Sequence, residues 1–277
     1  MFKEAFKYTN ETFKDKFMTF FLILLPLALV SSLIQSFNLP DTSSIDITQP
    51  PSTSPGEELG KYPILGILNQ LFLQGLMLSY IAIKAIDDSH SKGKLKNISD
   101  YYYGSILFIF RLFVLSLLLL LIGLLGAGPG AILVVIGQAI NIELISNIGG
   151  VIAIIGVLFV VLKTVFSYYY LICENKSFSD SILASYYSIP NQKLAYLFGV
   201  FLLLSIFIII LAILGSFILG LALSPFMGIS MGAYLFAITF VFTLLAMTVI
   251  NVYLFLFIYH LYLHFKGDVS GSLNADS

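Results

Sequence analysis

The stretch from residue 151 to residue 190 decides the fold. It begins with an apolar run, VIAIIGVLFVVLKTVFSYYYLIC (151–173), which is followed by the polar elbow Glu174-Asn175-Lys176. The elbow leads into SFSDSILASYYSI (177–189), which Pro190 ends. At ~1.5 Å per residue the run is long enough to cross the ~30 Å hydrocarbon core of a bilayer. The stretch therefore predicts a membrane span, a polar elbow and a short surface helix.

The composition indicates a membrane protein. Of the 277 residues, 58% are hydrophobic and only 10% are charged, whereas soluble domains carry ~25% charged residues. The net charge of −1 leaves no large basic face for nucleic acid. Cys173 is the single cysteine, which excludes intramolecular disulfides and cysteine-cluster metal sites. We expect an all-α integral membrane protein with one polytopic domain over residues 1–277.

Two segments have the pattern of amphipathic helices that lie at the membrane surface. In the segment 177–189, apolar side chains fall on one helical face opposite serines and Asp180, and Ser177 or Ser179 could cap the helix. In the segment 1–16 and at Phe17, four phenylalanines fall near one face, with lysines elsewhere. We expect both to be interfacial helices.

Six apolar segments are long enough to be transmembrane helices: 17–37, 62–86, 104–125, 148–172, 194–223 and 230–263. The segment 38–61 is rich in Pro, Ser and Thr and is expected to be a flexible periplasmic loop. The glycine-rich stretch 126–130 is expected to break the third span. The segment 131–146 is apolar but short for a crossing, and we expect it to be re-entrant or interfacial.

Two elbows share a sequence pattern. Lys96-Asn97-Ile98-Ser99-Asp100 and Lys176-Ser177-Phe178-Ser179-Asp180 both read lysine, any residue, an apolar residue, serine and aspartate. Together with the segment 1–16, this match predicts three tandem units, each with a surface helix followed by two crossings. Chance similarity in a biased composition is the alternative.

The positive-inside rule fixes the expected orientation. If the N-terminus is cytoplasmic, all 14 Lys and Arg residues except Lys61 lie in or nearest to the cytoplasm. Six crossings then return the C-terminus to the same side. We therefore expect a multi-pass protein of a bacterial inner membrane with both termini in the cytoplasm.

A few polar side chains within the spans are candidates for a site. Lys163 is deep in the fourth span and is expected either to face other helices or to extend toward the membrane surface, and Arg111 is expected to extend to the surface. Facing inward, Lys163 could bind an anionic lipid headgroup. The candidate polar lining consists of Lys163, Asn69, Gln70, Gln74, Asn251 and Arg111.

No catalytic, cofactor or metal site is expected. The chain has no paired-carboxylate, HExxH, Walker or GxSxG pattern. His260 and His264 share a helical face, but no third ligand accompanies them, so interfacial histidines are the simpler interpretation. A lipid-headgroup enzyme would have to draw on these two histidines with Asp87, Asp88 and His90.

The two ends of the chain resemble a known family. FKYTNETFKDKFMTFFLILL (6–25) resembles the opening of the YciC-like family of uncharacterised inner-membrane proteins of Gram-negative bacteria, and NVYLFLFIYHLYLHFK (251–266) resembles its last helix. The stretch 156–193 is similar to a wider pattern of span, basic residue, elbow helix and Asn, in which Lys163 takes the place of the basic residue and Asn191 that of the Asn. The pattern departs where Pro129-Gly130 precedes the span by some twenty residues. The resemblance implies a multi-pass inner-membrane protein and no established activity.

These observations predict a non-enzymatic membrane protein with a structural or partner-organising role. Its expected partners are the bilayer, anionic lipid headgroups and another membrane protein, with no nucleic acid. The alternative is a transporter or channel for a small or lipid-like solute, which would use the polar lining described above.

Overall fold

The computed structural model describes residues 2–37, 63–93, 95–223 and 248–267, and within these residues the fold is helical with no strand. The expected loop 38–61 and the start of the sixth span lie outside the described residues. The helices are α1 (Phe2–Phe37), α2 (Pro63–Leu68), the π-helix η2 (Asn69–Met77), α3 (Leu78–Ser91), α4 (Ile98–Ala139), α5 (Glu143–Thr164), α6 (Ser167–Cys173), α7 (Phe178–Ser188) and α8 (Asn191–Leu223). A C-terminal helix covers Thr248–Gly267. The all-α class is confirmed.

Several of these helices are long and apolar enough to cross a membrane. Four in the described part of the chain qualify by length and composition: Gly66–Ser91, Ile98–Ala139, Glu143–Cys173 and Thr248–Gly267. A fifth candidate is the pair Phe178–Ser188 and Asn191–Phe207, which bends by 94°. The expected first span lies within α1, which is continuous with the predicted interfacial segment 1–16 and contains no non-helical residue at their junction.

The chain forms two compact units. Unit 1 contains residues 1–11, 110–217 and 256–277, and unit 2 contains residues 12–109 and 218–255. Unit 1 thus combines both ends of the sequence with its middle, and unit 2 combines the two segments that lie between them.

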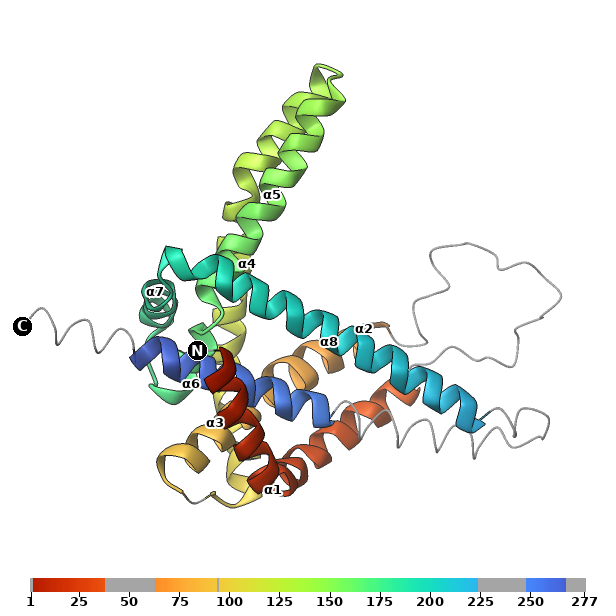
Figure 1. The fold of residues 1–277 in the computed structure, drawn as a ribbon, viewed down its shortest axis with the longest axis vertical. Coiled ribbons are helices and arrows are strands. Elements are labelled where there is room, and N and C mark those ends of the chain that lie inside the picture. Colours follow the sequence, from red (N-terminus) through yellow and green to blue (C-terminus); the bar gives the residue numbers. More distant parts are fainter. Residues whose placement is uncertain (1, 38–62, 94, 224–247, 268–277) are drawn as a thin grey trace, which may run out of the picture. The chain divides into compact units, whose positions relative to one another are not determined.

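In unit 1, α4 and α5 form a hairpin (Figure 1), and the two helices pack together along glycines. A Cβ atom added at Gly126, Gly130 or Gly137 of α4 would lie less than 3.0 Å from backbone atoms of α5, and one at Gly149 or Gly156 would meet α4 in the same way. Small residues that let two backbones approach are typical of helix pairs in membranes. These five glycines, here called the glycine seam, therefore set the distance between α4 and α5.

The glycine seam explains why residues 126–130 do not break the helix. α4 continues through Pro129, whose side chain is exposed on the outside of the hairpin, and ends only at Ala139. Membrane helices tolerate an internal proline of this kind. The segment 131–146 is not a separate element, because its first residues complete α4 and its last residues begin α5. Its re-entrant or interfacial placement stays a prediction.

The turn of the hairpin is polar and tight. Asn141 has a left-handed φ of 54°, which asparagine accepts more readily than most residues. Its amide donates to the carbonyl of Gln138 at 3.2 Å, and the amide of Ile142 donates to the carbonyl of Gly137 at 2.9 Å. The turn between α4 and α5 therefore follows directly after the apolar part of α4.

In unit 2, a tyrosine hydroxyl inserts into the backbone hydrogen bonds of α1 next to a proline. Pro26 lies inside α1, and the hydroxyl of Tyr102 donates to the carbonyl of Ile23 at 2.8 Å and accepts from the amide of Leu27 at 3.2 Å. These two backbone groups would bond to each other in a regular helix. Insertion of a hydroxyl into the ladder is a known way to bend a helix without leaving its polar groups unpaired.

Candidate functional site

The structure divides the predicted polar lining between the two units. Lys163 and Arg111 belong to unit 1, whereas Asn69, Gln70, Gln74 and Asn251 belong to unit 2. The amide nitrogen of buried Asn69 donates to the carbonyl of Ser31 at 3.1 Å, so this residue joins η2 to α1, as expected for a polar group between neighbouring helices. Gln70 is exposed and Asn251 is half-buried, and the side chain of Gln74 lies outside the described residues.

Lys163 faces the protein. Its side chain is only 4% exposed, and its ammonium donates to the carbonyl of Ile189 and, at 3.4 Å, to that of Tyr186. The same nitrogen lies 4.7 Å from the centre of the Tyr186 ring. Helix C-termini leave carbonyls without intrahelical donors and carry partial negative charge. The lysine therefore caps the end of α7, and no lipid headgroup is needed to explain its burial.

The contact between the fourth span and α7 is reciprocal. The span is interrupted at residues 165–166, between α5 and α6. The hydroxyl of Ser185 on α7 donates to the carbonyl of Lys163 at 2.9 Å and accepts from the amide of Phe166 at 3.1 Å. Ser185 thus satisfies two backbone groups at the interruption, and Lys163 satisfies two at the end of α7. We call this arrangement the α5–α7 latch.

The buried face of α7 consists of serines. Ser177 caps the helix, as expected, by accepting from the amide of Asp180. Ser181, Ser185 and Ser188 are buried, while Leu183 and Tyr187 are exposed. Small hydroxyl side chains let α7 approach the interrupted span closely. A helix with its serines inside and its large apolar side chains outside suits an apolar environment.

The elbow after α6 is organised by one carboxylate. The hydroxyl of Tyr262 donates to Oε1 of Glu174, and Nζ of Lys266 lies 2.9 Å from the same oxygen. Nζ of Lys176 lies 3.1 Å from Oε2. Burial alone would raise the pKa of the Glu174 carboxyl, but these three donors outweigh it and hold the pKa below its usual value of 4.5. Glu174 therefore ties the C-terminal helix to the elbow as a carboxylate.

This cluster predicts an acid-sensitive contribution to stability. Since the pKa of Glu174 is lowered in the folded state, its contribution is complete above the unfolded value of 4.5 and is lost as the pH falls through the lower folded value. The lysines are partly exposed, so we expect less than ~1 kcal/mol. When unfolding is measured in detergent from about pH 6 to about pH 3, the free energy of unfolding should fall more steeply with pH for the wild type than for Glu174→Gln. Equal slopes would contradict this role of Glu174.

Arg111 meets the same elbow. Its guanidinium donates to Oδ1 of Asn175 and, at 2.9 Å, to the carbonyl of Lys176, and it lies 6.0 Å from the centre of the Phe178 ring. Asn175 has a left-handed φ of 51°, which turns the chain sharply between α6 and α7. Arg111 is thus held by the elbow.

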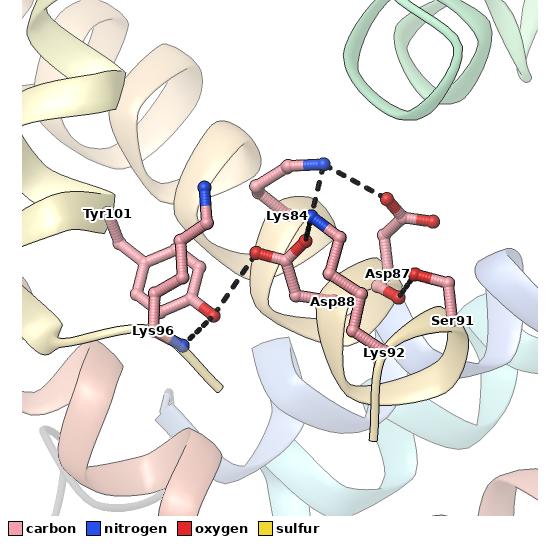
Figure 2. Close-up of polar contacts among 7 residues, drawn as sticks. All are labelled: Lys84, Asp87, Asp88, Ser91, Lys92, Lys96 and Tyr101. Carbon is pink, nitrogen blue, oxygen red and sulfur yellow. Dashed lines mark hydrogen bonds and ion pairs between the residues drawn. The ribbon is translucent and has the colours of Figure 1, made fainter. Parts of the chain in front are cut away.

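Unit 2 has a comparable cluster at the elbow between α3 and α4 (Figure 2). The side chain of Asp88 is fully buried, and Oδ1 lies 3.5 Å from Nζ of Lys84 and 3.4 Å from Nζ of Lys92. The hydroxyl of Tyr101 donates to Oδ2 at 3.4 Å and accepts from the amide of Lys96 at 3.1 Å. A buried carboxylate requires such partners, because its desolvation is costly.

The two clusters have the same make-up: one carboxylate, two lysines and one tyrosine hydroxyl. The neighbouring Asp87 is also paired, at 3.1 Å from Nζ of Lys84. Sequence reasoning missed both clusters, because Tyr101 in one and Tyr262 and Lys266 in the other come from a second helix. The signal that could have found them is the presence of acids beside lysines at both elbows. Each cluster fixes a chain turn, and neither leaves its carboxylate without a cation.

A groove of about 380 Å³ lies between α5 and α8 in unit 1. Its lining runs from Leu158 to Val165 on α5 and from Phe198 to Ser205 on α8, and Ser205 supplies the one hydroxyl. The volume falls within the ~300–1,000 Å³ that is usual for small-molecule sites. The predicted polar lining does not contribute to this groove, which suits an apolar ligand.

Metal ligands do not gather in the described part of the chain: no group of three or more His, Cys, Asp or Glu side chains is placed to hold an ion. The ring of His260 packs 6.1 Å from that of Tyr8, and the ring of His264 packs against Phe265. No family model, curated protein or solved structure matches the chain.

Proposed function

We propose that this protein is a non-enzymatic, six-span protein of a bacterial inner membrane with a structural or partner-organising role. The observation that carries the proposal is the surface of the α4–α5 hairpin. Only 11% of the most apolar stretch of α4 and 6% of that of α5–α6 is buried within the chain. Such a surface needs lipid or another membrane protein against it.

The contacts of the charged side chains support a non-enzymatic role. Glu174 and Asp88 are both paired with lysines, and Lys163 is bound to the end of α7. General acids, bases and nucleophiles need access to a substrate. These groups instead hold helix ends and elbows in place. The YciC-like resemblance belongs to the same proposal, since it implies an inner-membrane location and no activity.

The orientation follows from the two ends of the hairpin. Arg111 and Lys176 contact each other at one end, whereas the turn at the other end carries Asn141 and Glu143 and no cation. The roughly 30 residues between Arg111 and Asn141 rise about 45 Å along the helix, which matches the thickness of a bilayer including its headgroup regions. The basic end is therefore cytoplasmic. A reporter fused after Lys176 should show a cytoplasmic position, and one inserted at Asn141 a periplasmic position; the reverse pattern would overturn the orientation.

Photo-crosslinking in intact cells tests the partner-organising role. A crosslinking residue at Leu125, which is 75% exposed on α4, should give a discrete protein adduct. The matched control is Leu115 on the same helix, which is fully buried and should give none. If Leu125 and other exposed positions of the hairpin yield lipid adducts alone, the hairpin organises no protein partner.

The groove favours a second candidate function, the movement of a lipid-like solute. An apolar groove open to the bilayer could accept one hydrocarbon chain, although a proton-coupled mechanism lacks ionisable groups there. Purified protein in vesicles should then speed the transfer of a fluorescent acyl lipid between leaflets, and Ser205→Trp should abolish the effect by filling the groove. Transfer at the rate of protein-free vesicles would eliminate this candidate.

A further inference from the structure

η2 (Asn69–Met77) is a π-helix of nine residues that joins α2 to α3 in unit 2. In a π-helix each amide bonds to the carbonyl five residues back, whereas in an α-helix it bonds to the carbonyl four residues back. A π-helical turn therefore holds about one more residue than the α-helical turn that could replace it. Such turns are rare, and they occur frequently at functional sites. η2 is thus a place where the helix can change its register.

The start of η2 holds two neighbouring amide side chains in contrasting surroundings. Asn69 is only 3% exposed, and its Nδ2 donates to the carbonyl of Ser31 on α1 at 3.1 Å. Its Oδ1 is buried and accepts no hydrogen bond from the described part of the chain. Gln70 is exposed, on the stretch Gly66–Ser91 that is long and apolar enough to cross a membrane. A buried acceptor without a donor and an amide that faces lipid are both unfavourable. The present register therefore leaves both amides imperfectly satisfied.

A change of one residue in the register of η2 exchanges these two amides. α3 is the fixed side, because it is anchored by buried side chains such as Ile81 and Ala85. When one π turn becomes an α turn, all residues before it move one helix position away from α3, ~1.5 Å along the axis and ~100° around it. Gln70 then takes the position that Asn69 holds now. Its amide can donate to the same carbonyl of Ser31, with one more methylene group to reach it.

The two registers already overlap at the C-terminal end of η2. The amide of Leu78 bonds to the carbonyl of Leu73, five residues back, and also to that of Gly75, three residues back. The carbonyl of Gly75 further accepts from the hydroxyl of Ser79 at 2.5 Å. In an α-helix this carbonyl would accept from the amide of Ser79 instead. Ser79 can therefore serve the carbonyl of Gly75 in either register, which lowers the cost of converting one into the other.

We propose that η2 is a register switch with two states. In the state described above, Asn69 binds the carbonyl of Ser31; in the other state, η2 has lost one π turn and Gln70 binds it. α2 rotates with the exchange, and its exposed side chains Ile64 and Ile67 turn with it. The switch thus changes the apolar surface that α2 presents to its surroundings. This inference goes beyond the proposed function, since it depends neither on the number of crossings nor on a particular partner.

Two spin labels can measure the rotation of α2 against α1. Cys173→Ser removes the single cysteine, and Val30→Cys on α1 with Ile67→Cys on α2 supplies two exposed labelling sites within unit 2. Pulsed electron paramagnetic resonance on the full chain in vesicles gives the distance between the labels. A side chain ~5 Å from the helix axis moves by about 8 Å when the helix turns by ~100°. Ile64→Cys in place of Ile67→Cys gives a second distance that samples another direction of the same rotation.

We expect Asn69→Leu to shift at least one of the two distances by several ångströms, because Gln70 is then the only amide that can bind Ser31. Gln70→Leu should keep the wild-type distances, since it removes the amide of the other state. Asn69→Gln should also keep them, because it restores an amide at the same place. If Asn69→Leu does not fold, Asn69→Ala makes the same test. Wild-type distances in the Asn69 variant that lacks the amide, or an equal shift in Gln70→Leu or Asn69→Gln, would overturn the register switch.

Discussion

Gly130→Leu is expected to destabilise the α4–α5 hairpin by about 3 kcal/mol, which is at the upper end of the usual range for overpacking. The Cβ atom alone would overlap the backbone of Gly149 and Ala153, and backbone atoms cannot rotate out of the way. The two helices must therefore separate along their length. Reversible unfolding in mixed micelles would measure the loss.

Gly123 supplies the matched control for this prediction. It lies on the same helix seven residues earlier, and nothing lies within 4 Å of the place where its Cβ would be. Gly123→Ala should stabilise α4 by roughly 0.5–1 kcal/mol, because alanine has the higher helix propensity. Gly130→Ala should destabilise. If both alanine variants shift stability in the same direction, the glycine seam does not set the helix distance.

Ser185→Ala is expected to open the α5–α7 latch. It leaves the carbonyl of Lys163 and the amide of the fully buried Phe166 without the hydroxyl that now serves both. Each unsatisfied buried group costs ~1–3 kcal/mol, so the total should be about 2–4 kcal/mol. Hydrogen exchange at residues 165–167 should rise with the loss of stability.

Ser179→Ala is the control for the latch. Ser179 lies on the same helix but is exposed, so its substitution should change stability by less than about 0.5 kcal/mol. Lys163→Met should reproduce part of the Ser185→Ala effect, since it removes the other half of the latch. Stability equal to the wild type for Ser185→Ala would mean that water replaces the hydroxyl, and that the latch holds nothing together.

Local features were predictable where a single segment determines them. The cap at Ser177 and the end of α7 before Pro190 follow from side-chain and backbone rules that act within one turn. The two matching elbows illustrate the limit of such rules. The shared pentad starts a helix at Ile98 and at Phe178, yet α4 runs for 42 residues and α7 for 11. The motif therefore specifies a helix start, and the rest of the proposed unit does not follow from it.

Features made by two segments were not predictable, and at residues 126–130 the structure is the opposite of the prediction. Residues 126–130 were expected to break a helix because Gly and Pro do so in water. In the hairpin, Gly126 and Gly130 instead provide the close contact with α5, a neighbour that a single segment does not reveal. The same reason applies to α7, because its sequence did not reveal that the serine face would be the one buried against the protein. In an apolar environment, the polarity pattern of a helix does not by itself say which helix face packs against the protein.

The length of the hairpin bears on the membranes that can hold this protein. Because the backbones of α4 and α5 touch along the glycine seam, the pair cannot shorten by sliding or splaying without losing that contact. A bilayer thinner than the hairpin has to thicken around it or force it to tilt, and either response costs fractions of a kcal/mol for each ångström of mismatch. The length of the hairpin is therefore fixed. In a membrane that contains thin and thick regions, the protein should partition into the thick ones.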